Sequence, residues 1–335
     1  MKVVKAFGPG DLRIMEIPVP IPGPGKALVR VRASGICGSD KWFWRVARPV
    51  DDVAGHEISG EVVDVGPGVR SLKPGDRVAI NNVVGCGRCD DCRKGDFVRC
   101  ANRPGKDVNN GFAEYVAAPE RNCLKLDRRI SFEAGCLIFD NWGTPFAAIR
   151  RAGVKAGDSV IVTGCGPIGL AAVKLCVGLK ASVIAVDPVE YRRNIAGQLG
   201  AAAVLAPDVV FLSRVRELTA GRGADIVLEC SGKGLAYAAG LSVLRVGGTF
   251  VAIGEGAQFD LHPSELIIRN HLNLLGSWYT TMNQGREVQA LMLRRKIPDP
   301  SVFVTHRPRL EDLPRVFGKI ADCADGVLKA VVTAA

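Results

Sequence analysis

The chain has 335 residues, 47% of them hydrophobic and 23% charged, a composition typical of a globular protein with room for two hydrophobic cores. No apolar run reaches the roughly 18 uncharged residues of a membrane span, and the N-terminus lacks the apolar core of a signal peptide, so we expect no membrane partner and a cytoplasmic location. The net charge of +10 comes from basic residues scattered in ones and twos, which argues against nucleic acid as a partner.

The first 150 residues predict an antiparallel, barrel-like β domain. Short β-runs are expected at 27–33, 58–65 and 77–82. Turn signals rich in Pro and Gly, such as the segment 22–25, separate these runs. A series of short strands and tight turns favours a closed or sandwiched β structure over a helical one.

Two sets of potential metal ligands lie in this half. Cys86, Cys89, Cys92 and Cys100 supply four thiolates, the donor set of a closed, tetrahedral and therefore structural zinc site. With 11 cysteines, an odd number, a disulfide scaffold is not expected. The second set is dispersed, because Cys37 lies in the motif Gly-Ile-Cys-Gly-Ser-Asp and His56 with Glu57 follows later in the chain. Spacing alone does not distinguish these residues from ordinary polar side chains.

From about residue 150 the pattern changes to alternating strands and helices, which predicts a parallel, doubly wound sheet. The expected strands are 159–163, 182–186, 224–229, 249–253 and 272–275. The expected helices are 167–179 and 190–199, followed near the C-terminus by helices 284–295 and 310–320 and a strand at 328–333.

A glycine-rich turn between the strand 159–163 and the next helix predicts a dinucleotide site. Gly164, Gly166 and Gly169 would permit a tight turn, close backbone approach to a pyrophosphate, and close helix packing. The residues between them, Pro167 and Ile168, open the helix whose N-terminus would face the phosphates.

The preference for NAD over NADP is predicted from the end of the second strand. Asp187 stands there and would accept hydrogen bonds from ribose hydroxyls and repel a 2′-phosphate. Arg192 lies just downstream and would soften that preference.

These motifs, together with Lys73-Pro-Gly-Asp-Arg-Val78 and Gly111-Phe-Ala-Glu-Tyr-Val116, resemble the zinc-containing medium-chain alcohol dehydrogenase family, in its polyol and threonine dehydrogenase branch. The resemblance implies a GroES-like β-barrel catalytic domain of residues 1–149 and 278–335, and a Rossmann NAD-binding domain of residues 150–277. It further implies a homodimer or homotetramer with two zinc ions per chain, one catalytic and one structural.

The resemblance also implies roles for single residues. Cys37 and His56 would bind the catalytic zinc, Glu57 would be a ligand or exchange partner, and Asp140 would be the remaining ligand. Ser39 would accept the proton of the substrate hydroxyl. Where relatives carry a His that passes this proton outward, the chain has Trp42.

The expected reaction is hydride transfer from a secondary alcohol of a small polyol or sugar-derived substrate to NAD⁺. Threonine or another amino alcohol is one alternative, and a sugar phosphate or sugar acid, favoured by Arg45 and Arg48, is another. An NAD-binding regulatory zinc protein is a remote alternative, because it would need a continuous basic face.

Overall fold

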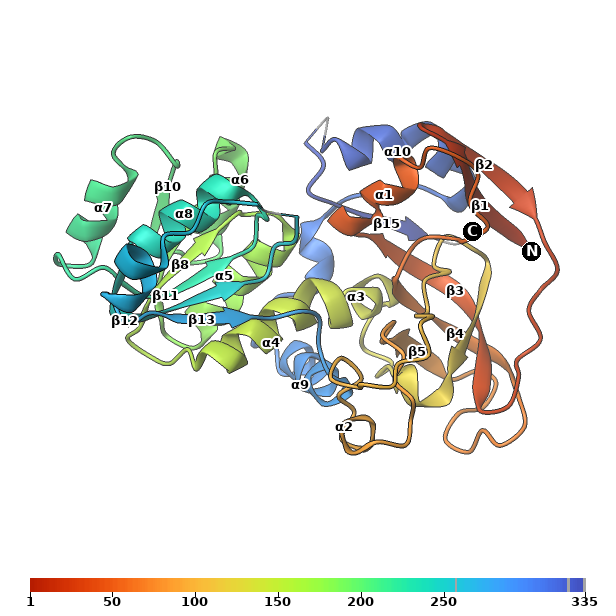
Figure 1. The fold of residues 1–335 in the computed structure, drawn as a ribbon. Coiled ribbons are helices and arrows are strands. Elements are labelled where there is room, and N and C mark those ends of the chain that lie inside the picture. The colour runs from red at the N-terminus through yellow and green to blue at the C-terminus, as the bar shows by residue number, and fades with distance from the viewer. Residues whose placement is uncertain (257, 324–325, 334–335) are drawn as a thin grey trace. The chain divides into compact units, whose positions relative to one another are not determined.

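The computed structural model describes residues 1–256, 258–323 and 326–333. It divides into two compact units, Met1–Asp140 with Thr280–Ala335, and Asn141–Tyr279 (Figure 1). Residues 257, 324–325 and 334–335, which fall inside the expected domains, lie outside the described residues. Within the described part, no helix combines the length and the apolar character needed to cross a bilayer.

The first unit is built on a seven-stranded sheet in the order β14-β15-β3-β4-β5-β7, with β6 also paired to β3, and on a separate β1-β2 hairpin. All of these pairs are antiparallel except β14 with β15. The strands are β1 (Lys2–Gly8), β2 (Asp11–Glu16), β3 (Lys26–Ile36), β4 (Glu57–Val65), β5 (Arg77–Ile80), β6 (Tyr115–Pro119), β7 (Cys123–Lys125), β14 (Val304–His306) and β15 (Lys329–Thr333).

The helices of this unit are α1 (Lys41–Trp44), α2 (Asp90–Arg93), α3 (Phe132–Cys136), α9 (Met282–Leu293) and α10 (Leu313–Ala321). Three of the helices of this unit are single turns, and α9 is the longest. Single 3₁₀ turns span Gly38–Asp40, Glu120–Asn122, Pro300–Phe303 and Leu310–Asp312. A π-helical turn, Ile138–Trp142, follows α3 and ends in the second unit.

Two separate cores hold this unit together. One is formed by β-branched side chains of β3, β4 and β5, including Val29, Ile58 and Val78, all with 0% exposure. The other is aromatic, with the ring of Phe317 on α10 packed 6.4 Å from Phe43 and 6.0 Å from Phe112. Burial of such side chains stabilises the unit by roughly 1.5–3 kcal/mol for each large one.

The second unit confirms the predicted parallel sheet. Six strands lie in the order β10-β9-β8-β11-β12-β13, and every neighbouring pair is parallel. The strands are β8 (Ser159–Thr163), β9 (Ser182–Val186), β10 (Ala203–Leu205), β11 (Ala224–Glu229), β12 (Leu244–Ala252) and β13 (Asn273–Gly276). The helices are α4 (Gly143–Ala152), α5 (Pro167–Gly178), α6 (Glu190–Gln198), α7 (Phe211–Leu218) and α8 (Gly234–Ser242), with a π-helical turn at Ser264–Ile268.

Some element ends differ from the expectation for identifiable reasons. The strand expected at 77–82 ends at Ile80, because Asn81 and Asn122 exchange backbone and side-chain hydrogen bonds there at 2.7–2.8 Å. The helix expected at 310–320 begins with a 3₁₀ turn, and its α-helical part starts at Leu313, where Pro314 occupies the first turn.

Candidate metal centres and dinucleotide site

The four dispersed candidate ligands meet at one place in the first unit. Cys37 follows β3, His56 and Glu57 lie at the start of β4, and Asp140 lies in the π-helical turn after α3. One ligand atom from each lies within 4.8 Å of all the others. Residues 19 positions apart come together because β3 and β4 pair antiparallel, with Gly35 opposite Glu57.

His56 is held between two carboxylates. Its Nδ1 lies 3.3 Å from Oδ1 of Asp40, and its Nε2 lies 3.0 Å from Oδ2 of Asp140. Asp40 is 1% exposed, and its other oxygen accepts a hydrogen bond of 2.8 Å from the Cys37 backbone N–H. Burial lowers the pKa of His56, but the charge of Asp40 and the hydrogen bonds to both carboxylates raise it well above its ordinary value. Asp40 thereby fixes the ring so that Nε2 faces the other ligands.

Glu57 forms a buried ion pair with Lys329 of β15. Lys329 Nζ donates to Oε1 of Glu57 at 2.5 Å and to the carbonyl oxygen of Ile36 at 3.0 Å. Burial raises the pKa of Glu57 to about 7, against the opposing effect of the Lys329 charge. Burial lowers the pKa of Lys329, but the Glu57 carboxylate outweighs it and raises that pKa above its ordinary value. Gly35 is required here, because a Cβ at that position would lie 1.9 Å from Oε2 of Glu57.

A zinc ion fits this group of side chains. A thiolate, an imidazole and two carboxylates are donors that zinc accepts in proteins. Burial raises the pKa of the Cys37 thiol and the nearby Asp140 carboxylate adds to this effect, while His56 opposes it. A bound cation would favour the thiolate. Oε2 of Glu57 is buried and has no hydrogen-bond partner among the residues that the structure describes. A buried carboxylate oxygen without a donor is costly, and a metal ion would satisfy it.

Ser39 and Trp42, the two residues considered for proton transfer, lie on the surface. Ser39 is exposed in the 3₁₀ turn Gly38–Asp40, two residues from Cys37. Trp42 lies on α1, is 45% exposed, and makes an edge contact with the ring of Phe43. Neither side chain is buried among the candidate ligands.

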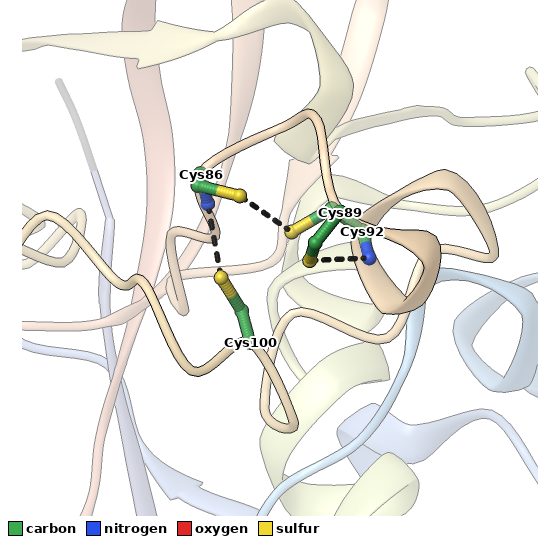
Figure 2. Close-up of side chains that lie close together, drawn as sticks. All are labelled: Cys86, Cys89, Cys92 and Cys100. Carbon is green, nitrogen blue, oxygen red and sulfur yellow. Dashed lines mark hydrogen bonds between the residues drawn. The ribbon is translucent and has the colours of Figure 1, made fainter.

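The four clustered cysteines converge in a loop of the first unit (Figure 2). Their sulfur atoms all lie within 4.8 Å of one another, and the Sγ atoms of Cys86 and Cys92 are 4.0 Å apart. Tetrahedral Zn–S bonds of about 2.3 Å place sulfur atoms roughly 3.8 Å apart, so only a small contraction separates this geometry from a zinc site. All 11 cysteines are free thiols.

The local backbone already favours thiolate at one of these cysteines. Backbone N–H groups of Arg88 and Cys89 donate to Cys86 and lower its pKa to about 6. Burial instead raises the pKa of Cys92 to about 12. The loop is tied to the start of α9 by a 2.9 Å hydrogen bond from the Met282 N–H to the Gly95 carbonyl oxygen.

The glycine-rich turn has the geometry expected of a phosphate-binding loop. Gly164 has φ = +86°, Gly166 is the N-cap of α5, and Pro167 with Ile168 begins that helix. A Cβ at Gly169 would lie 1.8 Å from the carbonyl oxygen of Gly164, so the close helix approach requires glycine. The free backbone N–H groups of this helix end favour an anion.

Asp187 is more deeply integrated into this turn than the sequence indicated. Its Oδ2 accepts a hydrogen bond of 2.7 Å from the Cys165 N–H, and its Oδ1 accepts one of 2.8 Å from the Val189 N–H. The residue is 3% exposed, and Arg192 Nη1 lies 4.0 Å from Oδ2. Asp187 therefore fixes the turn itself, and its carboxylate retains further acceptor capacity for a ribose.

Two residues of the first site, Asp40 and Lys329, were not predicted from the sequence. Asp40 was within the motif that contains Cys37, and its place in that motif was the available signal. Lys329 had no local signal, because 272 positions separate it from Glu57 and only the pairing of β15 with β3 brings them together.

Comparison with known proteins gives consistent matches. The family pattern described as alcohol dehydrogenase GroES-like domain matches residues 23–128, and the one described as zinc-binding dehydrogenase matches residues 167–294. The chain is 36% identical to L-threonine 3-dehydrogenase of Symbiobacterium thermophilum, over 91% of this chain and 90% of that protein. It is 34% identical to Probable D-xylulose reductase A of Aspergillus terreus, over 75% of each. A solved NAD-dependent alcohol dehydrogenase superposes with a TM-score of 0.88 at 28% identity, over 99% of both chains.

Proposed function

Because the chain belongs to the zinc-containing medium-chain alcohol dehydrogenase family, we propose that it transfers a hydride from a secondary alcohol of a small polyol or sugar-derived substrate to NAD⁺. The observation that carries this proposal is the convergence of Cys37, His56, Glu57 and Asp140 within 4.8 Å. The relative named as a xylulose reductase supports the polyol class of substrate.

In this proposal Cys37, His56 and Asp140 hold the catalytic zinc, and Glu57 is a ligand or exchange partner. When bound, zinc supplies Lewis-acid polarisation that lowers the pKa of the substrate hydroxyl. Ser39, exposed beside Cys37, accepts the hydroxyl proton and passes it to water. Asp40 orients His56 through the contact between its Oδ1 and the ring Nδ1.

The second unit would bind the nicotinamide cofactor. Gly164, Gly166 and Gly169 receive the pyrophosphate at the N-terminus of α5, and Asp187 accepts the ribose hydroxyls. A buried carboxylate at that position disfavours the 2′-phosphate of NADP, and Arg192 moderates this preference because it lies 4.0 Å away. Residues 150–277 are thus the proposed NAD-binding domain, and 1–149 with 278–335 the proposed catalytic domain.

Two further expectations belong to the same proposal. Cys86, Cys89, Cys92 and Cys100 hold a structural zinc that replaces a hydrophobic core in their loop. The chain forms a homodimer or homotetramer, and β13 supports this because it is the last strand of its sheet, with β12 as its one partner in the described residues. Edge strands of this kind are pairing sites for a second copy. A cytoplasmic location stays a prediction.

Two alternative substrates have specific support. An amino alcohol such as threonine is favoured by the relative named L-threonine 3-dehydrogenase. A sugar phosphate or sugar acid is favoured by the exposed Arg45 and Arg48, which follow α1. Nothing in the described part of the chain favours the alternative of an NAD-binding regulatory zinc protein.

A substrate panel tests the proposal. Zinc-loaded protein is assayed for NADH and NADPH formation with polyols, sugar acids, sugar phosphates, threonine and simple secondary alcohols. The Cys37→Ser variant is the control. Turnover with a polyol that disappears in this variant supports the proposal, and the best substrate identifies the class. Equal turnover in both proteins contradicts the zinc mechanism.

A further inference from the structure

Glu229 is a buried acid at the end of β11, in the second unit. It is 0% exposed and lies opposite Thr163, the last residue of β8. From β8 the chain builds β9 and β10 to one side of the sheet and then β11, β12 and β13 to the other. In open parallel sheets the ligand crevice lies at the carboxyl ends of the strands, where the strand order reverses. Glu229 stands at that reversal.

The carboxylate of Glu229 organises the turn that follows it. Oε1 accepts hydrogen bonds from the Ser231 N–H, at 2.8 Å, and from the Ser231 hydroxyl, and Oε2 accepts one of 3.1 Å from the Gly232 N–H. The backbone carbonyl oxygen of Glu229 accepts from Ile253 and Gly254, both at 2.9 Å. A buried carboxylate is stabilised where donors compensate for its lost hydration, and Ser231 and Gly232 in the following turn supply such donors here.

This turn is packed directly against the glycine-rich turn. A Cβ at Gly164 would lie 2.8 Å from the Cβ of Ser231 and 2.9 Å from its backbone N. A Cβ at Gly254 would lie 2.2 Å from the backbone N of Gly232. The loops after β8, β11 and β12 are thus packed so closely that no methyl group fits between them at Gly164 or Gly254. A displacement of Ser231 would therefore displace Gly164.

We propose that Glu229 is a positioning residue for the dinucleotide. By fixing Ser231 and Gly232, it holds the Gly164 turn in its phosphate-binding conformation before the cofactor arrives. Binding then requires less ordering of the loop, which increases affinity without any contact between Glu229 and the cofactor. This inference rests on the proposed use of NAD and adds the residue that prepares its site.

The test compares Glu229→Gln with Asp225→Asn as a matched control. Glutamine keeps the shape but presents an NH₂ group to one of the backbone N–H donors. Asp225 lies at the other end of β11 and accepts hydrogen bonds from the Ser159 N–H at 2.8 Å and Arg245 Nε at 2.6 Å. Both variants remove one carboxylate from the same strand, but only the carboxylate of Glu229 lies beside the Gly164 turn.

The measurements are the Kd for NADH by fluorescence titration and the KM values for NAD⁺ and for the alcohol. For Glu229→Gln we expect a roughly tenfold increase in the Kd for NADH and the KM for NAD⁺, because one buried donor loses its acceptor. The KM for the alcohol should change less than about twofold, since the interaction concerns the cofactor alone. Asp225→Asn should change none of these constants. Both variants should lower the Tm, because each removes the acceptor of a hydrogen bond.

An unchanged Kd in Glu229→Gln, or an equal increase in Asp225→Asn, would overturn the inference. If Glu229→Gln does not fold, Ser231→Ala decides. It keeps the Cβ that faces Gly164 and removes one donor to Glu229, so the Kd should rise about threefold. An unchanged Kd in that variant would refute the role of Glu229. Wild-type protein that binds no NADH at all would instead contradict the proposed function, which is a separate result.

Discussion

Replacing Lys329 by Met should destabilise the first unit more than the loss of an exposed ion pair would. Lys329 is 3% exposed and Glu57 is 2% exposed, so the pair is shielded from water. Removal of one partner of a buried pair typically costs about 3–5 kcal/mol, because the other charge is left unpaired. Burial already raises the pKa of Glu57 to about 7. Glu57 would therefore take up a proton in the variant, which reduces the expected loss to about 2–4 kcal/mol.

The assay is urea unfolding of protein freed of zinc by a chelator, so that no bound ion changes the pKa of Glu57, and a double-variant cycle isolates the pair. Lys329→Met, Glu57→Gln and the double variant are compared with Lys2→Met. Lys2 pairs with Glu311 at 2.9 Å, but both side chains are more than 40% exposed, so its removal should cost far less than the removal of Lys329. The double variant should lose less than the sum of the single losses, because neither charge is then buried alone. Strictly additive losses, or equal losses for Lys329→Met and Lys2→Met, would refute the reasoning.

Three further predictions concern the other sites. Cys92→Ser should release one zinc per chain and make the cysteine loop sensitive to proteolysis. Metal analysis and limited digestion would detect these two changes. A variant that retains both zinc ions would contradict a closed four-thiolate site. Asp187→Ser should raise the KM for NAD⁺ about tenfold, because the turn loses an acceptor and a negative charge. The KM values for NAD⁺ and NADP⁺ should therefore become more similar, which steady-state kinetics with both cofactors measures. An unchanged ratio of the two KM values would count against the role of Asp187. Replacing Arg45 and Arg48 by Ala should raise the KM for anionic substrates and leave the KM for neutral substrates unchanged. If the variant and the wild-type protein have equal KM values for anionic substrates, the two arginines are only surface residues.

Much of the dinucleotide unit could be predicted because its signals are local. Strands 159–163, 182–186 and 224–229 each have an apolar centre of three or more residues, and the structure has all three at those positions. Helix α8 was not predicted, because Gly234–Ser242 consists mostly of small and apolar residues with no amphipathic period. Helix α7 was missed as well, and it is only eight residues long.

Only one of the two metal centres has a local signal in the sequence. The cysteine loop could be predicted from spacing, because all four thiolates lie within one short segment. The dispersed site needed a resemblance, since only the β3–β4 register brings Cys37 next to His56. Asp140 came from the resemblance alone, and it lies in a π-helical turn that no sequence pattern indicated. Lys329 comes from the last strand, and its role follows only from tertiary packing.

The most direct test of the central claim is the zinc content of Asp140→Ala. Asp140 is 7% exposed and contacts His56, and it belongs to the one ligand group that we assign to catalysis. We expect this variant to keep the zinc of the cysteine loop, to lose the second zinc, to bind NADH and to show no turnover. A variant that retains two zinc ions per chain and full activity would contradict the claim that Cys37, His56 and Asp140 hold a catalytic metal.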